Sequence, residues 1–366
     1  MTISVGGGGV GKTTTSAALA LHMARQGKRT LVITVDPARR LADALGVEIG
    51  AATAVAPIDP RAEGRLYARM PDTRASFADF MRWLFVDDAQ LKRVMDNPAS
   101  KEMADSLAGI HEILTIALLQ NEYDSGQFDE IVLDTAPSRH ALAFITYPGK
   151  LLEMLEAKAT TWLAEMAENL QAEESGKRRG FFAWGRAKVE GIFGKVVGLE
   201  GLRNMSALFA EIASVRDRWA ELARRTEKML GEKSTRYLIV GAPTGGAISD
   251  VQYLVASLDR RKLKPTAVVL NRAESEPPAC ERQVAELLDT HKGIVSAADE
   301  TAIRAALAAL ASEHRVRAVA ADEAVRALTS RIPRGTPIIR LPFVGPAMPN
   351  EIVLALADEW AESSLR

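Results

Sequence analysis

Short runs of consecutive apolar residues recur along the chain, and stretches with the apolar spacing of helices separate them. Such runs are typical of strands that are buried on both faces of a parallel sheet. The runs are Thr2–Val5, Arg29–Val35, Leu66–Met70, Glu130–Leu133, Tyr237–Gly241, Ala267–Leu270 and Pro337–Leu341. Their alternation with helical patterns predicts an α/β fold, a mainly parallel sheet flanked by helices.

The middle of the chain departs from this alternation. Between about Leu151 and Leu230 there are several helical patterns and no convincing strand. We therefore expect residues 151–235 to form a helical insertion that interrupts a core. Residues 1–150 would be the first part of that core and residues 236–366 the second. A length of 366 residues suits one large α/β domain or two smaller ones.

A glycine-rich loop follows the first predicted strand and precedes a predicted helix that ends near Arg25. It reads Gly6-Gly7-Gly8-Gly9-Val10-Gly11-Lys12-Thr13-Thr14 and satisfies the pattern G-x-x-x-x-G-K-[ST] in the strand–helix context that the pattern requires. Glycines let backbone N–H groups converge on phosphate oxygens, and the helix adds its positive N-terminal end. In such loops the lysine, here Lys12, reaches the β- and γ-phosphates, and the hydroxyl of Thr13 is a Mg²⁺ ligand.

Asp36 follows the second predicted strand, in the segment V-D-P-A-R-R. A carboxylate at this point can orient or deprotonate an attacking water, and Pro37 would fix the turn. The alternative is a helix N-cap, because proline suits the first helical position. One residue could serve both purposes.

Asp134 ends the run E-I-V-L-D and opens the segment Asp134-Thr135-Ala136-Pro137-Ser138-Arg139-His140. Acidic residues at this kind of strand end hold Mg²⁺ directly or through water. The alternative for Asp134 is a structural turn residue. We interpret Asp134, Thr135, Ala136, Pro137 and His140 as a switch segment, in which His140 is a packing or hinge residue and not a general base.

Charge and cysteine content narrow the function further. The chain has 46 Lys and Arg against 47 Asp and Glu, so nothing in its overall charge favours a nucleic-acid partner. The single cysteine, Cys280, excludes an internal disulfide, a two-thiol zinc clip and a four-thiolate cluster, and we expect no zinc or iron–sulfur cluster. The start of the chain lacks a signal-peptide pattern, and no apolar run approaches ~18 residues. These features indicate the cytoplasm.

Taken together, the motifs resemble those of the ArsA-type ATPases, a family of the deviant Walker A class that includes the arsenite-pump ATPase and the tail-anchored-protein targeting ATPase. The family loop G-K-G-G-V-G-K-T-T corresponds to Gly6–Thr14, its D-P-A element to residues 36–38, and its D-T-A-P segment to residues 134–137. Asn271 matches an adenine-contacting asparagine, and Pro342-Phe343 resembles the late loop that covers the base. The resemblance implies a dimeric switch driven by ATP and Mg²⁺, with hydrolysis through Asp36.

Three departures from the family pattern change what the resemblance implies. The signature lysine, which crosses the dimer interface to the partner's phosphates, is replaced by Gly7. Hydrolysis would then be slow, or another cation would substitute; Arg39, Arg40 and Arg139 are the candidates. The C-x-x-C pair that holds zinc in the targeting ATPase has only Cys280 here. One cysteine and one phosphate loop also argue against an arsenite-stimulated pump.

The resemblance gives the helical insertion a role as well. In the targeting ATPases the helices after the D-T-A-P switch form an apolar groove for a client's transmembrane helix. The same stretch is rich in Met and aromatic residues here, which suits a hydrophobic client or a membrane-protein partner. Internal packing and contact with a membrane surface are the alternatives.

Two other functions stay open. One is a positioning ATPase of the ParA/MinD type, which shares the phosphate loop. The other is a weakly active regulatory subunit that pairs with a related chain, as the loss of the lysine at Gly7 would allow. Whether a dimer is made of two identical chains or of two different ones is open too.

Overall fold

The computed structural model describes residues 1–35, 39–49, 53–62, 65–71, 73–100, 110–136, 153, 198–275, 286, 289–290, 296–345 and 347–364. The chain forms two compact units. The sheet unit comprises Met1–Met70, Gln127–Leu142 and Lys233–Arg366, and the helical unit comprises Pro71–Gly126 and Ala143–Glu232.

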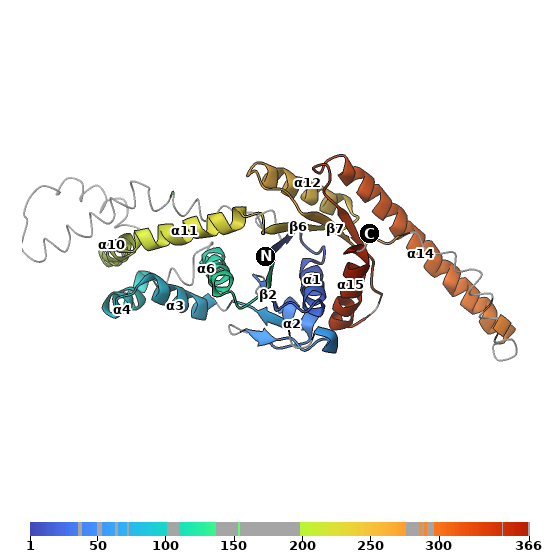
Figure 1. Cartoon of the computed structure of the whole chain (residues 1–366), viewed down its shortest axis with the longest axis horizontal. Coiled ribbons are helices and arrows are strands. Elements are labelled where there is room, and N and C mark those ends of the chain that lie inside the picture. The colour runs from blue at the N-terminus through green and yellow to red at the C-terminus, as the bar shows by residue number, and fades with distance from the viewer. Residues whose placement is uncertain are drawn as a thin grey trace, which may run out of the picture. The chain divides into compact units, whose positions relative to one another are not determined.

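In the described part of the sheet unit, eight strands form one sheet in the order β3-β4-β2-β5-β1-β6-β7-β8. Figure 1 labels β2, β6 and β7 of this sheet. They are β1 (Thr2–Gly6), β2 (Thr30–Thr34), β3 (Ala54–Val55), β4 (Leu66–Arg69), β5 (Glu130–Asp134), β6 (Arg236–Gly241), β7 (Ala267–Asn271) and β8 (Ile338–Leu341). All neighbours are parallel except β3, which runs antiparallel to β4. The predicted α/β class is confirmed, and the fold is that of a P-loop NTPase.

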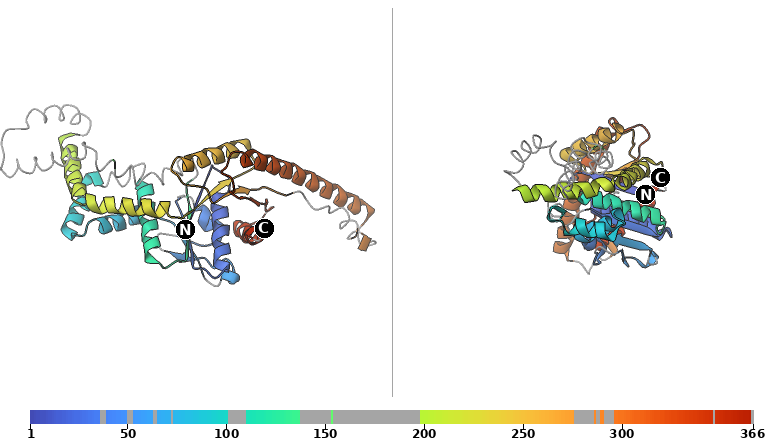
Figure 2. Two further views of the ribbon diagram at one scale, coloured as in Figure 1. Left: turned by 45° about the horizontal axis from the view of Figure 1, so that its top comes forward. Right: turned by 90° about the vertical axis from the view of Figure 1, so that its left-hand side faces the viewer.

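Helices of the sheet unit follow most of its strands. They are α1 (Lys12–Arg25), α2 (Arg40–Leu45), the 3₁₀ turn η1 (Pro60–Ala62), α12 (Gly245–Asp259), α14 (Ala297–Thr329) and α15 (Pro349–Ser364). The first helix, α1, packs against β5, β2 and α15, and Figure 2 shows the ribbons of α1 and α15 next to each other. The alanines and leucines of α1 enter the main apolar core. Every residue of α1 from Thr15 to Ala24 is buried, the polar Thr15, Ser16 and His22 included.

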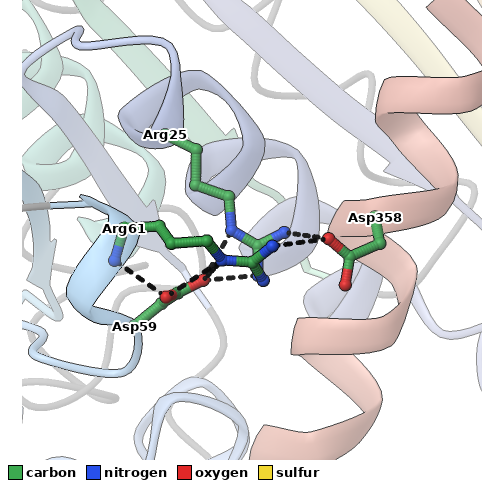
Figure 3. Close-up of polar contacts among 4 residues, drawn as sticks. All are labelled: Arg25, Asp59, Arg61 and Asp358. Atoms are coloured by element: carbon green, nitrogen blue, oxygen red, sulfur yellow. Dashed lines mark hydrogen bonds and ion pairs between the residues drawn. The ribbon is translucent and has the colours of Figure 1, made fainter.

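An ion-pair cluster joins α1, η1 and α15 at the end of α1 (Figure 3). The Arg25 guanidinium donates through Nε to Asp59 Oδ2 at 2.6 Å and through Nη1 to Asp358 Oδ1 at 2.9 Å. Arg61 donates its backbone N–H to Asp59 Oδ1 at 2.9 Å and a guanidinium N–H to Asp358 Oδ1 at 3.2 Å. Two cations and two anions therefore alternate across three segments that are far apart in the sequence.

The helical unit contains α3 (Thr73–Leu84), α4 (Asp88–Asp96), α6 (Ile110–Ser125), α10 (Gly198–Ser214) and α11 (Arg216–Gly231). It has its own apolar core, to which α3, α4, α6, α10 and α11 all contribute. The rings of Phe80 and Trp219 meet edge to face in this core, with centroids 5.6 Å apart. Within the described ranges, no helix combines the length and the apolar character that crossing a membrane requires.

The domain boundaries differ from the expected ones in one respect. Helices α3, α4 and α6 precede β5 and were expected in the first part of the core, but they belong to the helical unit. Their apolar side chains meet those of α10 and α11, and that packing cannot be recognised before the partner helices are placed. Residues 154–197, most of the expected insertion, lie outside the described residues. The rest of the division, and the groove expected in the insertion, remain predictions.

Candidate functional site

The glycine-rich loop connects β1 to α1 at the carboxyl end of the central strand. Gly9 has φ of +73° and Gly11 has φ of +88°, a region of backbone conformation that only glycine adopts without strain. Gly11 is also the N-cap of α1. No atom lies within 4 Å of the position that a Cβ would take at Gly8 or Gly9. The loop thus presents open backbone at a helix N-terminus, which is the arrangement that binds phosphate.

Lys12 is the first residue of α1 and is only 6% exposed. Its Nζ donates to the backbone oxygen of Gly7 at 2.9 Å. The side chain therefore folds back along the loop and holds its ammonium group beside the glycines. This is the position from which a lysine can bind the terminal phosphates of a nucleotide.

Asp134 is fully buried at the end of β5 and accepts two hydroxyl hydrogen bonds on one oxygen. Thr13 Oγ1 donates to Asp134 Oδ2 at 2.7 Å, and Thr34 Oγ1 donates to the same atom at 3.0 Å. The parallel pairing of β5 with β1 and β2 sets Asp134 opposite Ser4 and Thr34, so the strand order creates this cluster. The Thr13 hydroxyl and the Asp134 carboxylate are hard oxygen donors of the type that Mg²⁺ prefers, and the pair fits that ion.

A pocket of about 310 Å³ opens over the loop. Its lining comprises Gly9, Gly11, Lys12, Thr13, Thr14, Arg40, Asp43, Ala44, Thr135 and Pro349. Of the three candidate cations, Arg40 lines the pocket, Arg39 is exposed and does not line it, and Arg139 lies outside the described residues.

The switch residues are described only in part. Thr135 donates its hydroxyl to the backbone oxygen of Ser4 at 2.7 Å, and Ala136 is exposed. Asp36, Pro137 and His140 lie outside the described residues, so their roles stay predictions. Val35, the residue before Asp36, donates its N–H to the Asp134 backbone oxygen at 3.0 Å. The chain therefore leaves β2 beside Asp134.

The three residues predicted to contact adenine lie at the ends of β7 and β8. Asn271 ends β7, is 6% exposed, and donates its side-chain amide to the Val10 backbone oxygen at 2.9 Å. Pro342 and Phe343 directly follow β8, and the Arg317 guanidinium lies 5.4 Å from the centre of the Phe343 ring. The contact of Asn271 with the loop was not foreseen from the sequence, because nothing local in either segment indicates it.

Thr34 and Asp250 were missed in the same way. Thr34 is one of several hydroxyl residues in strands, and only strand pairing singles it out. Asp250, in α12, lies beside Gly7: a Cβ on Gly7 would come within 2.5 Å of Asp250 Oδ2. A carboxylate therefore occupies part of the space that a side chain at position 7 would need.

Comparison with known proteins agrees with this geometry. Residues 1–179 match the ArsA ATPase family, described as anion-transporting ATPase. The ATPase ASNA1 homolog 1 of Paramecium tetraurelia is 27% identical over 272 residues, which cover 74% of each chain. The ATPase get3 of Schizosaccharomyces japonicus is 36% identical over 157 residues, or 42% of this chain and 45% of that one. The ATPase get3 of Aspergillus terreus is 28% identical over 275 residues, or 74% and 72%.

The matched region contains the glycine-rich loop, Asp36 and Asp134, and the described sheet brings the loop and Asp134 together. The chain is therefore homologous to the ArsA-type ATPases.

Proposed function

We propose that this protein binds ATP with Mg²⁺, hydrolyses it, and acts as a dimeric switch whose nucleotide state controls a hydrophobic partner. The hydrogen bond of 2.7 Å between Thr13 and Asp134, next to the buried Lys12, is the observation that carries the proposal. It unites a phosphate-binding helix terminus with oxygen donors for the metal ion.

Each site residue has a distinct role in this proposal. The backbone of Gly6–Thr14 binds the phosphates, Lys12 neutralises the terminal ones, and Thr13 with Asp134 holds Mg²⁺. The bound ion neutralises part of the charge on the phosphate oxygens. Asp36 orients the attacking water, whereas Asn271, Pro342 and Phe343 bind adenine.

Turnover is slow in this proposal, because Gly7 supplies no cation to the transition state. Arg40 is the best placed of the candidate substitutes, since it lines the pocket while Arg39 does not. The carboxylate of Asp250 beside Gly7 favours a second candidate, a weakly active subunit that pairs with a related and more active chain.

The proposal also includes a partner for the switch. By the family resemblance, motion of Asp134, Thr135 and the residues that follow passes into the helices of the insertion and exposes or hides an apolar surface. A client helix or a membrane protein would bind there. We place this activity in the cytoplasm, in a homodimer or in a heterodimer with a related ATPase.

Phosphate release and light scattering on the same purified sample test the proposal. The wild-type chain should release phosphate from ATP with Mg²⁺ but not in EDTA, and should become a dimer with ATP. Lys12→Met should abolish ATP binding, and Asp36→Asn should retain ATP binding and lose turnover. Lys28→Met is the matched control, because Lys28 is a half-exposed lysine that bridges Glu130 and does not line the pocket.

Two results would contradict the proposal, one of them entirely and the other in part. A chain that binds no ATP would overturn it entirely. A monomer that binds ATP without turnover would replace the switch by the regulatory subunit, and mixing with a related ATPase should then restore turnover.

A further inference from the structure

We infer that Asn271 is a positioning residue for the phosphate loop and not only a contact for the base. The inference rests on the proposed ATP site and concerns its phosphate half. It begins with one contact: the Asn271 side-chain amide donates to the Val10 backbone oxygen at 2.9 Å, across 261 residues of sequence. Both residues are buried, with 6% exposure for Asn271 and 5% for Val10.

The position of Asn271 is set by the strand that carries it. Asn271 pairs with Leu341 of the neighbouring strand β8, and Ala273 N donates to the Leu341 backbone oxygen at 2.8 Å. Arg272, which lies between Asn271 and Ala273, has φ of +57°, and β7 ends directly before it. The Asn271 side chain therefore projects from a strand end that is held by hydrogen bonds on both sides of the turn.

The loop is shaped to receive this amide. A Cβ on Gly11 would overlap the Asn271 amide nitrogen, so the absence of a side chain at Gly11 makes the close approach possible. Gly11 also needs its left-handed φ of +88° to begin α1. Glycine at this position thus meets two separate demands, and one of them comes from Asn271.

The consequence follows from the geometry of a trans peptide. The C=O of Val10 and the N–H of Gly11 belong to one planar group and point in opposite directions. An amide that holds the C=O on one side directs the N–H to the other side. Because Gly11 lines the pocket, the contact with Asn271 orients a donor for the phosphates.

Tripolyphosphate separates this role from contact with adenine, since it has phosphates and no base. Calorimetric titration of wild type, Asn271→Ala and Phe343→Ala with ATP and with tripolyphosphate is the experiment. Asn271→Ala should lower the affinity for both ligands. The affinity for tripolyphosphate should fall by about tenfold, as expected for a lost buried hydrogen bond. Phe343→Ala should weaken ATP and leave tripolyphosphate within twofold.

Unfolding midpoints without ligand serve as the check on structure. A purely structural role would lower the midpoint of Asn271→Ala while tripolyphosphate affinity, measured well below that midpoint, stays the same. Asn271→Asp keeps the shape and removes the donor, so it replaces the alanine variant if that one does not fold. For Asn271→Asp the readout is amide hydrogen exchange of residues 8–12 in the absence of ligand. Without ligand, the added carboxylate has no phosphate to repel. We expect these amides to exchange faster than in wild type.

The outcomes distinguish the inference from the function on which it rests. If wild type binds neither ligand, the proposed ATP site is wrong. If wild type binds both and Asn271→Ala loses affinity for ATP alone, or if exchange in Asn271→Asp is unchanged, Asn271 does not position the loop.

Discussion

Asp134 shows how much of this site depends on single hydroxyl groups. One of its oxygens accepts from Thr13, the proposed metal ligand, and also from Thr34, which is 1% exposed and does not line the pocket. Thr34 would therefore still hold the carboxylate if the hydroxyl of Thr13 were bound to Mg²⁺. Hydrogen bonds to charged groups are stronger than neutral ones, so this contact should be measurable.

The near-isosteric variant Thr34→Val tests that contact. We expect ATP affinity in Mg²⁺ to fall about fivefold to tenfold, with little change in EDTA, because the loss acts through Asp134 and the ion. Thr34→Ser restores the hydroxyl and should recover most of the affinity. Equal affinities of wild type and Thr34→Val in Mg²⁺ would show that Thr13 alone is sufficient to hold the carboxylate.

Gly7 and Asp250 form a second pair at this scale. Gly7→Ala places a Cβ within 2.5 Å of Asp250 Oδ2, whereas Gly8→Ala meets no atom within 4 Å. Overpacking should lower the unfolding free energy of Gly7→Ala by about 1 kcal/mol, and Gly8→Ala should be near neutral. Denaturant unfolding without nucleotide measures both.

The double variant Gly7→Ala with Asp250→Ala provides the control for this pair. It should recover the loss caused by Gly7→Ala, since the carboxylate that the methyl group meets is gone. Additive losses would mean that position 7 and Asp250 do not interact. A lysine at position 7 would need the same space.

At the scale of elements, the cluster of Arg25, Asp59, Arg61 and Asp358 connects α1 to η1 and α15 (Figure 3). Burial alone would raise the pKa of Asp59, but the backbone N–H of Arg61 and the guanidinium of Arg25 hold the pKa below its ordinary value of 3.8. Because the pKa of Asp59 is lower in the folded chain than in the unfolded chain, its ionised carboxylate stabilises the fold at pH values above the unfolded-state pKa. That stabilisation is lost as the pH falls through the folded pKa.

Asp59→Asn should therefore lower the unfolding free energy at pH 7 by about 2 kcal/mol, and the difference from wild type should shrink as the pH falls below 4. Urea unfolding at several pH values gives the comparison.

Asp129→Asn is the control. The Arg29 guanidinium lowers the pKa of Asp129 to about 2, but the Asp129 side chain is 45% exposed, against 5% for Asp59. Added salt should erase the effect at Asp129 and spare most of the effect at Asp59. A pH-independent loss in Asp59→Asn would contradict this account.

At the scale of the whole molecule, the two units have separate apolar cores. Phe80 is buried in the helical unit and Leu356 in the sheet unit, with exposures of 5% and 1%. Phe80→Ala should cost about 3–5 kcal/mol and Leu356→Ala about 2–5 kcal/mol. Because each core is distinct, each loss should be greatest in its own unit.

Amide hydrogen exchange, read element by element, tests this separation. Phe80→Ala should speed exchange mainly in α3, α6 and α11, and Leu356→Ala mainly in α1, α2 and α15. ATP with Mg²⁺ should slow exchange in the sheet unit, where about 2.7 kcal/mol of stabilisation is expected at a hundredfold excess over the dissociation constant. Equal changes in both units for either variant would indicate a single cooperative molecule.

Local patterns in the sequence were sufficient to predict most strands of the sheet unit. Seven apolar runs correspond to β1, β2, β4, β5, β6, β7 and β8, with ends that differ by a few residues at most. The strand β3 was missed, because Ala54–Val55 is too short to carry a period. The loop motif could be recognised because glycine, lysine and threonine at that spacing are required by phosphate itself.

The sequence by itself therefore determined the fold class, the loop with Lys12 and Thr13, and the place of Asp134 at a strand end. Strand order was decided only in the tertiary structure, and with it the meeting of Thr34 with Asp134, of Asn271 with Val10 and of Asp250 with Gly7. The assignment of α3, α4 and α6 to the helical unit was decided there too. The physical reason is the same in each case: a periodic pattern states which face of an element is buried, whereas the element that covers this face is chosen by packing between distant parts of the chain.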